Sequence, residues 1–132
     1  MGTVVLCAGG IYAHCDGDTE VDPRSLIKSA LEAAWAIRRY FVHGDAGSTC
    51  QIGIHYGPCY GAVMGSTTLT FDVFGDTVNV ASRVSHVARS NRLVITQDVQ
   101  EYVDAFTTDP LPATDIKGKG SMQLFEVTSR NE

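Results

Sequence analysis

The sequence predicts an α/β or α+β domain in which helices pack on one face of a sheet. Two observations support this fold class. Strand-like apolar segments alternate with segments of helical periodicity, and Gly or Pro residues separate them without repeats or low-complexity tracts. The chain has 132 residues, 44% hydrophobic and 19% charged, which is enough to bury one core. Residues 1–132 are therefore expected to form a single domain.

The first part of the chain is expected to hold a strand and a long helix. Residues 3–8 form an apolar run that predicts a buried strand, and a Gly-Gly pair ends it. Asp22 and Pro23 predict a helix start, with Asp22 as N-cap and Pro23 as the first helical residue, and Gly44 predicts the end. Apolar residues recur at helical spacing between them: Leu26, Ile27, Ala30, Leu31, Ala34, Ile37 and Phe41.

The rest of the chain is expected to alternate short strands with two helices. Asp76 is expected to cap a helix that extends to about Val87, with Val80, Ala81 and Val84 on its buried side. Residues 98–106 predict a short helix, and "DIKGKGSMQLFEV" predicts two strands around a Gly-Lys-Gly turn. Further strands are predicted over residues 50–57, 59–65, 69–75 and 92–97.

Composition disfavours several classes of protein. The formal net charge of −5 argues against a nucleic-acid-binding surface. No apolar run approaches the roughly 20 residues of a membrane span, so a cytoplasmic domain is expected, which a longer protein could attach to a membrane. No CxxC pair occurs, which favours free thiols in a reducing compartment over zinc ligands. The cysteines are Cys7, Cys15, Cys50 and Cys59.

Polar side chains gather where a predicted strand turns into a predicted helix. Asn79 and Arg83 are four residues apart and therefore share one helix face, and Asp72 precedes the turn. Arginine suits phosphate, asparagine can hold a sugar oxygen, and a carboxylate can accept from an exocyclic amine. Lys117 in "KGKG" adds a cation on a glycine turn. The alternative interpretation is that these residues are only a solvated helix face and exposed turns.

The segment "FDVFGDTVNVASRV" resembles the signature of class III nucleotidyl cyclase catalytic domains. The resemblance continues over "QIGIHYGPCYGAVMG" and "IKGKGSMQLFEV" and covers nearly the whole chain. It implies a ferredoxin-like, palm-type sheet that is truncated at the N-terminus. It also implies an active site between two such domains, either a homodimer or a pair with a second cyclase domain.

The resemblance implies a role for each polar residue. Asp72 matches the residue that reads the purine amine, and an Asp there is typical of adenylyl cyclases. Asn79 and Arg83 match the catalytic residues that orient the ribose and stabilise charge at the reacting phosphate. Lys117 matches a phosphate-binding lysine. Arg92 matches a residue that contacts phosphate from the other half of the dimeric site. The implied reaction converts ATP to cyclic AMP and pyrophosphate with Mg²⁺ or Mn²⁺.

The chain departs from the family pattern at the metal site. The family uses two Asp residues as metal ligands. The segment that carries the first Asp would precede Met1, and the position of the second Asp aligns with Gly2-Thr3. A threonine hydroxyl is a poor ligand for a hard divalent cation, so no metal ligands are predicted in this chain. Three interpretations follow: one half of an adenylyl cyclase, a truncated or degenerate cyclase, or a nucleotide-binding or regulatory dimerisation module.

Overall fold

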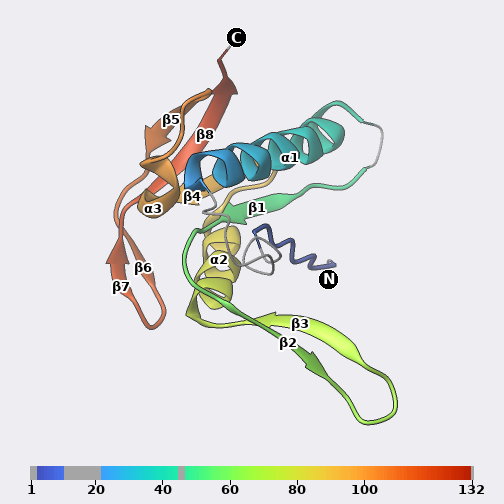
Figure 1. The fold of residues 1–132 in the computed structure, drawn as a ribbon. Helices are drawn as coiled ribbons and strands as arrows, with labels where there is room; N and C mark the ends of the chain where they lie inside the picture. The colour runs from blue at the N-terminus through green and yellow to red at the C-terminus, as the bar shows by residue number, and fades with distance from the viewer. Residues whose placement is uncertain (1–2, 11–21, 45–46, 132) are drawn as a thin grey trace.

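The protein is a mixed α+β domain, and the computed structural model describes residues 3–10, 22–44 and 47–131 (Figure 1). Three helices and eight strands follow one another in the described residues. Their order is α1 (Pro23–His43), β1 (Gln51–Ile54), β2 (Tyr60–Met64), β3 (Thr70–Phe74), α2 (Asp76–Val87), β4 (Arg92–Thr96), α3 (Gln97–Gln100), β5 (Phe106–Pro110), β6 (Thr114–Ile116), β7 (Gly120–Met122) and β8 (Leu124–Arg130).

The main sheet has four strands in the order β1-β4-β8-β5. β1 and β4 are parallel, with Ile54 opposite Ile95, and the other two pairs are antiparallel. β2–β3 and β6–β7 form separate antiparallel hairpins that extend away from this sheet (Figure 1). The parallel pair needs a long connection, which the β2–β3 hairpin and α2 provide.

The core lies on both faces of β4, because its side chains point alternately to the two sides. Leu93 and Ile95 pack in a cluster with residues of α1, whereas Val94 packs in a second cluster with Val80 and Val84 of α2. The mixed fold is therefore confirmed, but the expectation that the helices share one face needs correction. The continuous apolar run of β4 is typical of a strand buried on both faces.

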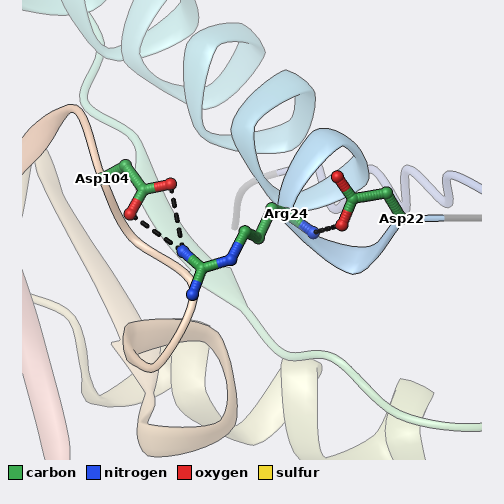
Figure 2. Close-up of polar contacts among 3 residues, drawn as sticks. All are labelled: Asp22, Arg24 and Asp104. Atoms are coloured by element: carbon green, nitrogen blue, oxygen red, sulfur yellow. Dashed lines mark hydrogen bonds and ion pairs between the residues drawn. The ribbon is translucent and has the colours of Figure 1, made fainter.

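The predicted start and end of α1 are confirmed. Asp22 is the N-cap, its Oδ1 accepts from the backbone N–H of Arg24 at 3.1 Å, and Pro23 follows in the first turn. Arg24 also donates through Nη1 to both carboxylate oxygens of Asp104, at 3.0 and 3.2 Å (Figure 2). At the other end, the backbone N–H of Gly44 donates to the carbonyl of Tyr40 at 2.9 Å. The contact between Arg24 and Asp104 holds the start of α1 against the loop that precedes β5.

Three local predictions were wrong. Residues 3–10 contain no strand and are largely exposed, because no neighbouring strand pairs with them; Val4 is 81% exposed. The helix predicted over residues 98–106 ends at Gln100, and Phe106 instead begins β5. Asp76 is the first residue of α2 and makes no capping hydrogen bond; Gly75 is the N-cap.

Candidate active site

Asp72 lies in the middle of β3, opposite Ala62 of β2. Its Oδ1 accepts from the backbone N–H of Val73 at 2.8 Å, and the residue is exposed. Side chains of opposite residues, and of every second residue along a strand, share a face. Asp72 therefore shares its face of the hairpin with Ala62, Tyr60 and Phe74, and this face combines one acceptor with apolar rings.

Asn79 is exposed in the first turn of α2, and its backbone N–H donates to the carbonyl of Gly75 at 3.3 Å. Gly75 has φ of 131°, a conformation that an L-residue adopts only with strain. The sharp strand-to-helix connection thus depends on this glycine. It places Asn79 one helical turn before Arg83, as the sequence predicted.

Arg83 and Lys117 are brought together, although 34 residues separate them in the sequence. Nη1 of Arg83 donates to the main-chain carbonyl of Lys117 in the turn between β6 and β7. Gly118 follows with φ of 83°, and a Cβ there would lie 3.3 Å from Nη1 of Arg83. Glycine therefore allows both the turn and the close approach of the guanidinium.

Lys119 makes a second contact between this turn and α2. Its ammonium forms an ion pair with the carboxylate of Asp76, seven residues before Arg83 and on the same helix face. The sequence predicts a capping role for Asp76 and indicates no role for Lys119. Helical spacing could have placed Asp76 on the same face as Arg83. It could not have predicted that the β6–β7 hairpin docks on this face. We call residues 117–119 the clasp turn.

Two predicted site residues make no described contact with this group: Asp72, whose carboxylate bonds the backbone of Val73, and Arg92. Nε of Arg92 lies 3.6 Å from Oε1 of Glu126. Arg92 is paired in register with Gln51, and the Gln51 side chain donates to the carbonyl of Ala88, at the C-terminal end of α2. Asn79 lies at the opposite end of this helix. Arg92 therefore does not join Asn79, Arg83 and the clasp turn within one chain.

His55, which belongs to no motif in the sequence, lies directly after β1. Its Nδ1 shares a hydrogen bond of 2.8 Å with Oγ1 of Thr96, which is fully buried. Burial lowers the pKa of His55 from its usual value of 6.5 and outweighs the nearby carboxylates of Asp98 and Asp76, which raise the pKa. Lys119 adds to the lowering. His55 is therefore neutral at neutral pH, and its 3.8 Å contact with Asp98 is then not an ion pair.

The family resemblance implies Mg²⁺ or Mn²⁺ as a cofactor, although the sequence predicts no metal ligands in this chain. Among residues 3–10, 22–44 and 47–131, no three His, Cys, Asp or Glu side chains gather in a way that could hold a metal ion. Thr3 lies in the exposed N-terminal segment. The Mg²⁺ or Mn²⁺ that the family resemblance implies thus finds no fitting ligand set in this part of the chain. The same residues include no helix long and apolar enough to cross a membrane.

Comparison with known proteins decides the family. Residues 2–129 match the family described as adenylate and guanylate cyclase catalytic domain. The chain belongs to the class III nucleotidyl cyclases. This membership confirms the resemblance inferred from the signature around Asp72, Asn79 and Arg83.

Relatives of this cyclase domain include enzymes named for either nucleotide. It is 35% identical over 85 residues to guanylate cyclase 32E of Drosophila melanogaster, covering 62% of this chain and 7% of that protein. It is 31% identical over 77 residues to adenylate cyclase type 9 of Gallus gallus, covering 57% of this chain and 6% of that protein. The chain thus spans less than a tenth of these relatives, and the family alone does not assign its nucleotide.

Solved cyclase domains share the fold of this chain. The guanylate cyclase domain of RhGC from Catenaria anguillulae in complex with GTP superposes with a TM-score of 0.76 at 30% identity, over 87% of this chain and 65% of that one. The catalytic core of a rhodopsin-guanylyl cyclase with converted specificity, in complex with ATPαS, superposes with a TM-score of 0.73 at 31% identity. The match covers 86% of this chain and 64% of that one. A dimeric guanylyl cyclase domain from Blastocladiella emersonii is 25% identical and superposes with a TM-score of 0.71. The match covers 87% of this chain and 65% of that one.

Proposed function

We propose that this chain provides the nucleotide-recognising half of an adenylyl cyclase active site, which converts ATP to cyclic AMP and pyrophosphate. The observation that carries the proposal is the docking of the clasp turn on α2, which puts Lys117 beside Arg83 and one turn from Asn79. The guanidinium of Arg83 thus meets the main chain of a distant segment that carries Lys117 and Lys119. This arrangement suits a polyphosphate better than it suits a solvated surface.

The reaction joins the ribose 3′-oxygen to the α-phosphorus and breaks the bond to the pyrophosphate oxygen, and the proton of the 3′-hydroxyl is released to water. Asn79 orients the ribose through its amide, which can both donate and accept. Arg83 and Lys117 stabilise the negative charge that develops on the phosphate oxygens. Arg83 has five N–H donors, so it can bind phosphate while one donor stays on the carbonyl of Lys117. Catalysis here is mainly positioning and electrostatic stabilisation.

Adenine recognition rests on Asp72. Its free carboxylate oxygen can accept from the exocyclic amine of adenine, whereas guanine presents a carbonyl at that ring position. The apolar face that Asp72 shares with Ala62 and Phe74 offers contact area for the base. ATP is therefore the proposed substrate.

The other half of the site comes from a second, metal-competent cyclase domain, which supplies the carboxylates for Mg²⁺ or Mn²⁺. A second copy of this chain would form a homodimer whose described residues hold no fitting metal-ligand set. The β2–β3 hairpin is the surface proposed to meet the second domain. Val63 and Phe71 lie opposite each other there and are 63% and 45% exposed, and Leu69 is 73% exposed. Such a projecting apolar surface is typical of an interface.

A second candidate function is a nucleotide-binding or regulatory dimerisation module without activity of its own. The absence of a metal-ligating cluster from the described residues favours it. Both proposals predict that the chain binds a nucleotide and a second domain. They differ in whether the composite site turns ATP over.

The deciding experiment mixes this chain with a metal-competent cyclase domain whose own transition-state arginine has been replaced. Cyclic AMP is assayed with ATP and Mn²⁺ for each chain alone and for the mixture. The proposal expects activity only in the mixture. Measurable ATP binding without turnover would support the module. If the mixture shows neither turnover nor ATP binding, both functions are refuted.

Substrate choice is tested by Asp72→Ala in the same mixture. Removing one specific acceptor should reduce the preference for ATP over GTP, measured as the ratio of kcat/KM, by about 10-fold or more. Asp109→Ala is the matched carboxylate control, because Asp109 is exposed on β5 of the main sheet, and it should leave the ratio unchanged. An unchanged ratio with Asp72→Ala would refute adenine recognition by this residue.

A further inference from the structure

The β6–β7 hairpin reaches α2 through one buried residue at its base and two polar contacts at its tip. Ile116, the last residue of β6, is 3% exposed and packs in a cluster with Val80 and Val84 of α2. The clasp turn begins directly after Ile116, and all three of its residues are exposed. Apolar packing therefore fixes the base of the hairpin, whereas polar contacts with α2 hold the tip.

The first polar contact uses a carbonyl that the turn itself does not need. The backbone N–H of Lys119 donates to the carbonyl of Ile116 at 2.9 Å and closes a four-residue turn. Gly118, its third residue, has φ of 83°, whereas Lys117 has a negative φ, so the turn is of type II. The central carbonyl, that of Lys117, takes no part in this closure and accepts from Nη1 of Arg83 instead.

The second polar contact is the ion pair of Lys119 with Asp76. Asp76 begins α2 and Arg83 follows seven residues later, so the two contacts lie on one helix face, about 10 Å apart along the axis. Two contacts at this separation fix the orientation of the turn. Either contact alone would let the turn pivot about its buried base at Ile116.

The end of α2 that carries Asp76 is itself held in place. The hydroxyl of Thr77, the next residue, donates to the main-chain carbonyl of Pro58 at 2.5 Å. A Cβ on Gly57 would lie 2.7 Å from that hydroxyl oxygen, so the loop after β1 packs closely on the start of the helix. Asp76 is thus a fixed anchor for the long, flexible side chain of Lys119.

We propose that Asp76 is a positioning residue: through Lys119 it holds the clasp turn on α2 and so keeps Lys117 beside Arg83, where the triphosphate binds. The last step rests on the proposed function, and Asp76 itself makes no contact with the nucleotide. A carboxylate near a triphosphate repels it. Pairing with Lys119 gives the carboxylate a use in a site for an anion.

The expected signature is a change in KM rather than in kcat. When the turn is loosened, only a fraction of the sites is ready to bind ATP, and the apparent affinity falls by that fraction. Bound ATP restores the turn, so kcat changes little. Asp76→Asn in the active mixture should therefore raise KM for ATP by about 5-fold, the scale of one exposed ion pair. Removal of a repulsive charge alone would lower KM instead.

A double-mutant cycle with Lys119→Gln separates positioning from helix stabilisation, because an acid in the first turn also favours the helix dipole. If Asp76 acts through Lys119, Asp76→Asn raises KM in the parent but has no further effect in Lys119→Gln. An effect on the helix itself would appear in both backgrounds. Asp76→Glu keeps the charge and should restore the KM of the parent.

Glu32→Gln is the matched control. It removes an ion pair of similar exposure, in which Oε1 of Glu32 on α1 lies 2.9 Å from Nη2 of Arg130 at the end of β8. This variant should leave KM unchanged. An unchanged or lower KM in Asp76→Asn, or an equal rise in both backgrounds of the cycle, would overturn the proposal.

Hydrogen exchange of the Lys119 amide follows the docking of the turn without nucleotide, since this amide closes the turn. Its protection factor should fall in the parent as the salt concentration rises from about 0.01 M to about 1 M, which shortens the screening length from about 30 Å to about 3 Å. In Asp76→Asn protection should be low at every salt concentration. Should that variant fail to fold, Lys119→Gln serves in its place with the same expected result. Parent-like protection in these variants would contradict the anchoring role.

Exchange does not require turnover, so the two proposals can fail separately. An inactive mixture in which Asp76 still controls protection would refute the cyclase function and leave the anchoring role of Asp76 standing. An active mixture in which Asp76→Asn keeps the KM of the parent would refute the role of Asp76 alone.

Discussion

Gly53 of β1 packs directly against the backbone of α2. A Cβ at this position would lie 2.8 Å from Cα of Ser85 and 2.9 Å from the carbonyl oxygen of Ala81, and it would collide with the backbone nitrogen of Ser85. All three atoms belong to the helix backbone and cannot rotate away as a side chain could. The absence of a side chain at residue 53 is therefore a packing requirement of the layer that carries Asn79 and Arg83.

Gly53→Ala is accordingly expected to destabilise the domain by about 1–3 kcal/mol, the usual cost of overpacking. Urea unfolding measures the change in the free energy of unfolding. Gly9→Ala is the control, because a Cβ at Gly9 would meet nothing within 4 Å. It should change stability by no more than about 0.5 kcal/mol. Equal stability of both variants would show that α2 shifts freely on β1.

At the scale of elements, the β2–β3 hairpin is the surface that we propose as the interface with a second domain. Val63 and Phe71 lie opposite each other and expose apolar area on the face away from Asp72. A charge placed there would have to be desolvated in an interface, at considerable cost. The same charge on the isolated domain would remain in water and cost little.

Val63→Glu is therefore expected to weaken association with the second domain by about 10-fold or more, while the unfolding free energy of the isolated chain changes little. Sedimentation equilibrium measures the dissociation constant. Ser66→Glu, in the loop that connects the two strands, is the matched control and should associate like the parent. If both variants associate equally well, the hairpin is not the interface.

The elements also differ in how far local sequence determined them. α1 was predictable because its cap, its proline and its apolar period are all local signals. β5 was missed because Thr107, Thr108 and Pro110 look like a turn; only pairing with β8 makes this segment a strand. The apolar run of residues 3–8 shows the converse, since a strand-like sequence stays exposed without a partner strand.

At the scale of the whole molecule, one part of the candidate site could be predicted from local sequence and the other part could not. Asn79 and Arg83 could be placed on one face from their spacing alone. The contact between Arg83 and Lys117, and the pair of Asp76 with Lys119, depend on docking of a distant hairpin that no local pattern encodes. Only the family resemblance anticipated that Lys117 belongs with Arg83.

A site divided between two domains predicts complementation. In the mixture with a partner that lacks its own transition-state arginine, the only composite site that can work combines the partner's carboxylates with Asn79 and Arg83 of this chain. Arg83→Ala should therefore lower kcat of the mixture by about 10²-fold or more, with a smaller change in KM for ATP. Arg39→Ala, an exposed arginine on α1, should leave kcat unchanged. Activity should peak at equal amounts of the two chains. Full activity with Arg83→Ala would mean that this chain only supports the fold of its partner, as a regulatory module would.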